Sequence, residues 1–200
     1  MCSRALQTFL ESFERVRGLS HVGRALEGQA LASVDMTEAF RASVVLAVSA
    51  LDSYVHNLCV EAIVQSYLGN RARNSCYGEA QVRLTSAEVG VNSGSASWLQ
   101  GELRAQFGRD TYQRAEDVAK ALRFVDDRPK KWVRIAGRLG DTPESVKLRL
   151  NSVVDRRNMI VHEADIDPAW GCVRPLKAGD AEVATEYVFR LVKAVEMECW

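Results

Sequence analysis

An arginine and a histidine five residues apart, Arg157 and His162, are the side chains with the clearest chemical potential in this chain. At about 100° per residue on a helix, Arg157 falls near the middle of an apolar stripe. That stripe is formed by Leu150, Val153, Val154, Ile160 and Val161. A guanidinium is always ionised, and its burial without a partner is strongly disfavoured. We therefore expect a carboxylate, a phosphate or a wet cleft to face the stripe.

A second face of the same predicted helix is polar and carries Asp155, Asn158 and His162. An imidazole titrates near neutral pH, so His162 is suited to accept and donate a proton. The alternative is an ordinary helix-end imidazole that is hydrogen-bonded to a carbonyl group. Arg156 lies off the apolar stripe, where either a solvated charge or a phosphate contact would fit.

Asp52 and His56 form a second polar pair, one helical turn apart in an otherwise apolar segment. Asp52 is the only formally charged residue between Arg41 and Glu61. An acid in such a segment needs a partner. Two interpretations remain open: a structural ion pair of Asp52 with Arg157 that keeps two helices in register, or an Asp52 that orients Arg157 or a histidine beside a pocket.

Three acids follow the histidine, at Glu163, Asp165 and Asp167. Alternating acids before a proline are typical of a solvated helix exit, although hydrolysis by a metal bound to Asp165 and Asp167 is a further hypothesis. We predict no metal site and no cofactor. The five cysteines are widely spaced and include no C-x-x-C pair, which indicates a reducing cytoplasm and neither a disulfide framework nor a zinc site. Cys59 and Cys199 are predicted to be buried.

Composition indicates one compact domain over residues 1–200, because a chain of this length with 47% hydrophobic residues can fill a single core. The 26 basic and 26 acidic residues cancel, so a polyanion would have to be held by a local site and not by a broad positive field. No secretory signal is recognisable, and Asp52 interrupts the longest apolar run, so no membrane span is predicted.

The elements that must position these residues are helices. Apolar spacing predicts helices at 3–17, ended by Gly18, and at 37–68, with shorter ones near 98–107, 118–125 and 132–139. Thr142, Pro143 and Glu144 begin the helix that carries Arg157 and His162, and it should end before Pro168. Asp180 is expected to cap a last helix whose inward residues include Val183. Residues 172–176 are predicted as a brief extended connection.

These segments predict an all-α bundle of about four core helices plus short accessory helices. Residues 1–36 would form an N-terminal helix and a connection, and residues 37–200 the core. The glycine- and serine-containing stretch near 74–97 is predicted to be a flexible loop within that core.

The residues around Arg157 and His162 resemble a known superfamily. Residues 157–162 match the R-x-x-x-x-H motif, including its frequent Arg-Asn start, of the HEPN proteins (higher eukaryotes and prokaryotes nucleotide-binding). The wider string 155–165 is similar to the RiboL-PSP-type branch, and segments like 41–56 and 111–113 are expected there in the same order. The resemblance covers the chain from about residue 37 to its end.

The resemblance implies a HEPN-type helical bundle that forms a homodimer, with two copies of the motif facing each other across a cleft. In many members this cleft is the active site of a metal-independent endoribonuclease. Carried over, His162 transfers the proton as the RNA 2′-hydroxyl attacks the phosphate, Arg157 stabilises the transition state, and Asn158 positions the phosphate or the histidine. The products are a 2′,3′-cyclic phosphate and a 5′-hydroxyl.

Four further residues, Asp52, His56, Arg156 and Glu163, are predicted to support this site or to bind substrate. The expected function is a cytoplasmic toxin or defence effector that cleaves RNA, with an antitoxin or another protein as a candidate partner. The alternative is a HEPN module without catalysis that serves in dimerisation, nucleotide binding or partner docking, which the neutral net charge favours.

Overall fold

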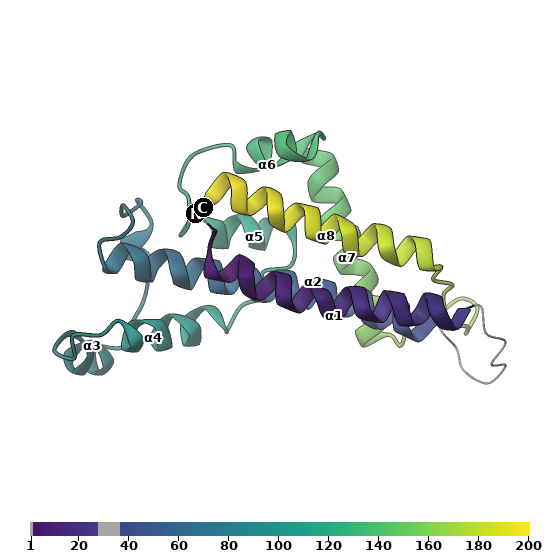
Figure 1. Ribbon diagram of the computed structural model, residues 1–200, viewed down its shortest axis with the longest axis horizontal. Coiled ribbons are helices and arrows are strands. Elements are labelled where there is room, and N and C mark those ends of the chain that lie inside the picture. The colour runs from purple at the N-terminus through teal and green to yellow at the C-terminus, as the bar shows by residue number, and fades with distance from the viewer. Residues whose placement is uncertain (1, 28–36) are drawn as a thin grey trace.

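The computed structural model describes residues 2–27 and 37–200 (Figure 1). Within these ranges the elements are α1 (Arg4–Glu27), α2 (Thr37–Tyr67), the 3-10 helix η1 (Tyr77–Glu79), α3 (Leu84–Val91), α4 (Ser97–Phe107), α5 (Ala115–Leu122), α6 (Lys131–Leu139), α7 (Pro143–His162) and α8 (Ala178–Cys199). Extended pairing within these ranges consists of one isolated bridge between Ile166 and Val173, which includes part of the predicted connection at 172–176. The all-α class is confirmed.

Four helices are long, with 24, 31, 20 and 22 residues in α1, α2, α7 and α8. They build the body of the molecule, and the shorter α3 to α6 are attached to it. In Figure 1, α1 and α8 run alongside α2, and α7 crosses behind them. Because α1 contributes to the same hydrophobic core as α2, the predicted N-terminal helix belongs to the core itself. The predicted connection before residue 37 lies outside the described residues.

Helix α1 is longer than the sequence pattern indicates. Its inward residues Leu6, Phe9 and Phe13 are buried as predicted, but the helix continues past Gly18 to Glu27. Gly18 does not adopt the left-handed conformation that ends helices at glycine. Packing explains the extension, because a Cβ atom at Gly23 would lie 2.6 Å from the Phe40 ring, so α1 and α2 approach closely there.

Helix α2 agrees with the predicted 37–68 and forms the centre of the core. Its seam residues Val44, Val48, Leu51, Val55 and Leu58 are completely buried. By length and composition α2 is long and apolar enough to cross a membrane, yet 61% of that apolar window is buried inside the protein. Such burial is typical of the central helix of a bundle.

The stretch 74–97, predicted to be a loop, contains η1 and α3 instead. The weak apolar periodicity of this stretch does not predict α3, because the helix is stabilised by tertiary contacts. Glu102 on α4 accepts hydrogen bonds from the backbone N–H and the side chain of Arg83 and from the Ser86 hydroxyl. Gly90 also lies directly against the Trp98 ring, where a side chain would not fit. These contacts fasten α3 onto α4.

The helix that carries Arg157 and His162 begins as predicted. The Thr142 hydroxyl accepts a hydrogen bond from the Ser145 N–H at 3.2 Å, and Pro143 occupies the first helical position. The last helix differs from the prediction. Helix α8 begins at Ala178, with Lys177 at the cap position and no side-chain cap, so Asp180 is inside the first turn. Val183, predicted to face inward, is 73% exposed.

One buried carboxylate joins three of the long helices. Glu196 on α8 accepts hydrogen bonds from the Ser3 N–H at 2.7 Å, from the Ser3 hydroxyl at 2.8 Å and from the Tyr54 hydroxyl at 3.0 Å. Ser3 precedes α1 and Tyr54 is on α2. The two ends of the chain are therefore held next to each other, as Figure 1 shows.

Candidate functional site

The apolar stripe of α7 is buried only over its first half. Leu150 and Val154 are inaccessible to solvent, whereas Ile160 is half-buried and Val161 is 48% exposed. Arg157 lies at this transition and is half-buried. His162, the last residue of the helix, is exposed. The stripe that the sequence indicates thus leaves the core and reaches the surface at the predicted site.

The guanidinium of Arg157 has no ion pair or hydrogen bond among the described residues, and its Nε atom is shielded from solvent. The expected partner Asp52 is engaged elsewhere, so the hypothesis of an Asp52–Arg157 pair is wrong. A shielded guanidinium N–H without an acceptor is unfavourable by about 1–3 kcal/mol. Arg157 is therefore the residue in this region that would gain most from an anionic ligand.

Ideal helix geometry sets the relation of Arg157, Asn158 and His162. Asn158 and His162 are four residues apart and share one face, whereas Arg157 and His162 are about 140° apart around the axis and about 7.5 Å along it. The three side chains surround the C-terminal end of α7 and do not form a single row. An anion at this end has to contact the helix from two sides to meet both Arg157 and His162.

Asp52 and His56 form a different site, in which they hold the segment after α4. The Asp52 carboxylate accepts hydrogen bonds from the Tyr112 N–H at 2.6 Å and from the Gln113 side-chain amide at 2.9 Å. His56 Nε2 lies 3.0 Å from the Phe107 carbonyl oxygen, and its ring is 4.6 Å from the Tyr112 ring. The two residues are partly buried and position a loop, and they do not touch Arg157.

The face of α7 that carries His162 also contacts this loop. Arg114 pairs with Asp155, and the Asn151 side chain accepts a hydrogen bond from the Ala115 N–H at 3.0 Å. The loop between α4 and α5 is thus bound to α2 on one side and to the first half of the polar face of α7 on the other. The two groups of predicted residues are joined through this loop.

Arg156 belongs to a third group, around a buried carboxylate that sequence reasoning interpreted wrongly. Asp165, predicted to be a solvated helix exit, is 1% exposed and accepts from Arg41 Nε and Arg156 Nη2, both at 2.8 Å. Arg156 Nη1 lies 2.7 Å from its second oxygen. Arg41 also donates to the Arg174 carbonyl oxygen at 2.7 Å. Arg156 is therefore neither a solvated charge nor free to bind phosphate.

The acid run does not converge on one point. Asp165 is taken by two guanidinium groups, while Glu163 and Asp167 lie 3.5 and 3.9 Å from Arg174 on the surface. The metal hypothesis at Asp165 and Asp167 loses its central ligand in this arrangement. The turn that buries Asp165 places Ala164 and Asp165 in the left-handed region, with φ of 49° and 57°. Non-glycine residues adopt this region at a cost, which the ion pairs offset.

Arg41 is the residue of this group that sequence reasoning did not select. The available signal was a cation at the start of the apolar helix α2, where it is 4% exposed. A buried cation requires an acid, and Asp165 is far away in the sequence. Nothing in the local pattern of either residue identifies the other.

The buried cysteines do not offer a competing nucleophile. Cys59 and Cys199 are buried as predicted, with 0% and 3% exposure. Burial raises the pKa of the Cys199 thiol to about 12 and also raises the pKa of Cys59. Only the thiolate is a good nucleophile, so both groups are inert at neutral pH.

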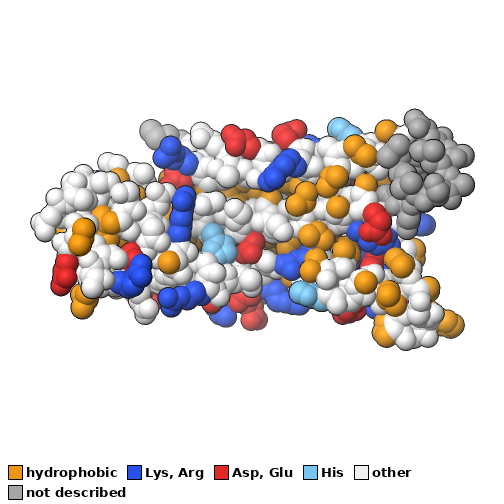
Figure 2. All heavy atoms as spheres, turned by 90° about the horizontal axis from the view of Figure 1, so that it is seen from below, with side chains coloured by type: hydrophobic (Ala, Val, Ile, Leu, Met, Phe, Trp, Pro, Cys, Tyr) orange, Lys and Arg blue, Asp and Glu red, His pale blue; other side chains and the backbone are white. Residues whose placement is uncertain are grey.

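Hydrophobic side chains are exposed around the end of α7 and in the segment that follows it. Val161, Ile166, Val173 and Trp170 are 48%, 42%, 50% and 82% exposed. Figure 2 shows hydrophobic side chains gathered toward one end of a face of the molecule, with basic and acidic side chains among them. An apolar surface beside an unpaired cation is the kind of surface that a macromolecule covers.

Comparison of the chain with protein-family models, with curated proteins and with solved structures finds no match. A functional assignment therefore depends on the residues and their geometry.

Proposed function

We propose that this protein is a metal-independent endoribonuclease of the HEPN type, which cleaves single-stranded or loop RNA in the cytoplasm as a toxin or defence effector. The observation that carries the proposal is the environment of Arg157. It is a half-buried guanidinium without a partner among the described residues, at the helix end where His162 is exposed. A phosphate of the RNA backbone supplies the missing partner, because guanidinium groups bind phosphate oxygens in a bidentate manner.

The reaction needs one proton acceptor, one proton donor and a cation. His162 takes the proton from the ribose 2′-hydroxyl, the 2′-oxygen forms a bond to phosphorus, and the bond from phosphorus to the 5′-oxygen breaks. The departing 5′-oxygen receives a proton, which leaves a 2′,3′-cyclic phosphate and a 5′-hydroxyl. Arg157 stabilises the negative charge on the phosphate oxygens, and Asn158 positions the phosphate.

Dimerisation is part of the proposal. One imidazole serves as the base and the second copy's imidazole as the acid when two α7 ends face each other. The exposed apolar residues Val161, Ile166 and Trp170 support such an interface, because their burial against a second copy is favourable. An antitoxin or another partner protein that covers this face would block the site. Light scattering tests the interface, and a strictly monomeric protein would contradict it.

The decisive experiment is cleavage of a labelled RNA in excess chelator by the wild-type protein and by His162→Ala. Loss of a general acid or base lowers the rate by about 10²–10⁴-fold, and the chelator should have no effect. His21→Ala is the matched control, because His21 is an exposed histidine on α1. Mass analysis of the products should find the cyclic phosphate. Equal cleavage by wild type and His162→Ala would refute the proposed role of the histidine.

A second candidate is a HEPN module without catalysis, which binds RNA, nucleotides or a protein partner. The angle of about 140° between Arg157 and His162 on one helix favours it, because a single copy does not present both groups side by side. RNA that stays intact under all conditions, together with a dimer in solution, would support this function over the enzyme.

A further inference from the structure

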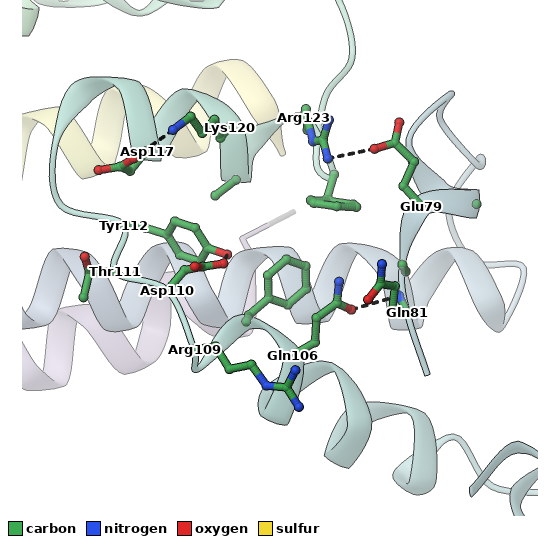
Figure 3. Close-up of a pocket in the computed structure, with 15 residues that line it drawn as sticks. Glu79, Gln81, Gln106, Arg109, Asp110, Thr111, Tyr112, Asp117, Lys120 and Arg123 are labelled. Carbon is green, nitrogen blue, oxygen red and sulfur yellow. Dashed lines mark hydrogen bonds and ion pairs between the residues drawn. The ribbon is translucent and has the colours of Figure 1, made fainter. Parts of the chain in front are cut away.

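A cleft outside the α7 site has the chemistry of a nucleotide-binding pocket. It has a volume of about 1160 Å³ and lies between the segment after η1, the C-terminal end of α4 and one face of α5 (Figure 3). Basic side chains stand on both rims: Figure 3 shows Lys120 and Arg123 on one side and Arg109 on the other, with Tyr112 between them. Phe107 is buried at the base of the cleft, and Phe124 is half-buried beside it.

The charges of the cleft are unequally compensated. Arg123 pairs with Glu79 at 2.7 Å, and Lys120 pairs with Asp117 at 3.3 Å. Arg109 is exposed, and its guanidinium has no ion pair or hydrogen bond within the described part of the chain. The carboxylate of the neighbouring Asp110 has, within the same residues, a single long contact of 3.5 Å, to the Tyr112 hydroxyl. As far as the described residues go, the cleft therefore offers the Arg109 cation to an anionic group and the Asp110 carboxylate to an amino group.

The half-buried Phe124 ring and the exposed Arg123 guanidinium that lies over it suit a nucleobase. The Arg123 guanidinium lies 5.0 Å from the centroid of the Phe124 ring, and the Phe107 and Phe124 rings meet edge to face at 5.2 Å. Bases that are unstacked from RNA pack on aromatic rings and on guanidinium planes of this kind. An acidic peptide would use the cations of the cleft and leave this stacking surface without a role.

The cleft is connected to α7 through the loop between α4 and α5. Tyr112 lines the cleft and is held by Asp52, and two residues later Arg114 pairs with Asp155 on α7. From Asp155 the same polar face of α7 continues to His162, over a distance of about 10 Å along the axis. A single RNA strand that lies across this face can thus contact both the cleft and His162.

We infer that the cleft is a subsite for one nucleotide of a single-stranded RNA substrate, away from the scissile phosphate. Arg109 binds the phosphate of this nucleotide. The base of the nucleotide packs on the Arg123 guanidinium and the Phe124 ring beneath it. The inference rests on the proposed ribonuclease function, and it adds a contact that determines substrate affinity and length preference. A polypeptide ligand in the cleft is the rival occupant.

Binding is tested on the full-length chain with His162→Ala, which prevents cleavage. The probe is a fluorescent single-stranded RNA of about 12 nucleotides, followed by anisotropy. Arg109→Glu should weaken binding by about ten-fold or more, since it replaces attraction of a phosphate with repulsion. Arg15→Glu changes the net charge equally at an exposed position on α1 and should leave binding unchanged within about two-fold. Arg109→Ala should lower the slope of log K against log salt by about 0.7, the loss of one phosphate contact.

Catalysis separates the subsite from the catalytic end. In the chain that retains His162, Arg109→Glu should raise the KM for the longer RNA without a change in kcat, whereas Arg15→Glu should change neither. Equal RNA binding by Arg109→Glu and its parent would overturn the subsite while the ribonuclease proposal stands. That result would favour a polypeptide occupant. Absence of RNA binding by the parent protein would overturn both proposals.

Discussion

Arg156 and Arg157 are neighbours on one turn of α7, yet their environments are opposite. Arg156 shares the buried carboxylate of Asp165 with Arg41, and all three groups form ion pairs of 2.7–2.8 Å. Arg157 is half-buried and has no partner among the described residues. The first arginine completes the fold, because its charge is compensated within the chain. The charge of the second arginine is not compensated by the described residues, so an anionic ligand can pair with it.

This contrast separates a structural cation from a candidate functional one. Removal of one member of a buried ion pair strongly destabilises the folded protein, because the other member remains as an uncompensated charge. An unpaired guanidinium should behave in the opposite way, since its removal relieves an unfavourable burial. Stability and activity should therefore respond oppositely to changes at these two adjacent positions.

The largest effect on stability is expected for Asp165→Ala. It removes the buried acid that Arg41 and Arg156 share and leaves Arg41, whose side chain is 5% exposed, with only the exposed Glu38 as an acidic partner among the described residues, so it should lower the free energy of unfolding by about 3–5 kcal/mol. Urea denaturation followed by circular dichroism measures this loss. The matched control is Glu163→Ala, an exposed acid two residues earlier, which should change stability by no more than about 0.5 kcal/mol. Similar losses for the two variants would show that the buried cluster has no special role.

Arg157→Ala should have the reverse profile. RNA cleavage should fall by about 10²–10³-fold, the typical loss on removal of one transition-state donor, while stability stays equal or rises slightly. Arg157→Lys retains the charge but not the planar fork, so its activity should be intermediate. The measurements are kcat/KM on labelled RNA and urea denaturation. A large loss of stability in Arg157→Ala would mean that this arginine is structural like its neighbour.

Glu196 extends the comparison to a compensated group far from the site. Glu196→Ala leaves the Ser3 N–H, the Ser3 hydroxyl and the Tyr54 hydroxyl without their acceptor. We expect a loss of about 2 kcal/mol in stability, with RNA cleavage of the remaining folded protein unchanged. Met197→Ala, at a neighbouring position with 60% exposure, is the control for thermal unfolding. An unchanged melting temperature in Glu196→Ala would contradict the role assigned to this carboxylate.

A change at Asp52 tests whether this residue affects RNA cleavage through Arg157 or through the loop between α4 and α5. Asp52→Ala removes the acceptor of Tyr112 and Gln113 and should reduce stability by about 1 kcal/mol. The KM for RNA should rise a few-fold at nearly constant kcat, because the loop shapes the binding surface and not the reacting groups. Ser53→Ala is the adjacent exposed control. A fall in kcat similar to that of Arg157→Ala would instead connect Asp52 directly with the chemistry.

The smallest effect is expected for the pair of the exposed Arg83 with the buried Glu102. Hydrogen bonds from Arg83 lower the pKa of Glu102 to about 2 from its ordinary value. Because the folded-state pKa is depressed, the pair contributes stability above the unfolded pKa of about 4.3 and loses it as the pH falls through about 2. Protection factors for amide hydrogen exchange in α3, which are corrected for the intrinsic pH dependence of exchange, should fall over this acidic range. Glu102→Gln should remove this pH dependence of the protection factors.

Much of the helical architecture follows from local sequence. The cap at Thr142 and Pro143, the apolar seam of α2 and the glycine after α6 are local signals, and each marks an element that the structure contains. Helix ends that depend on neighbours were predicted less well. Helix α1 passes Gly18 because close packing near Phe40 continues it, and α3 exists because α4 binds it.

The positions of Arg157 and His162 at the end of one capped helix follow from the sequence, since spacing along a helix is a local property. Which charges are compensated depends instead on the packing of distant segments. Asp52 binds a loop and not Arg157, and Asp165 is buried between Arg41 and Arg156. Arg41 and Asp165 are 124 positions apart, so their ion pair depends on how the helices pack. The isolation of Arg157, which supports its proposed function, is likewise a product of that packing.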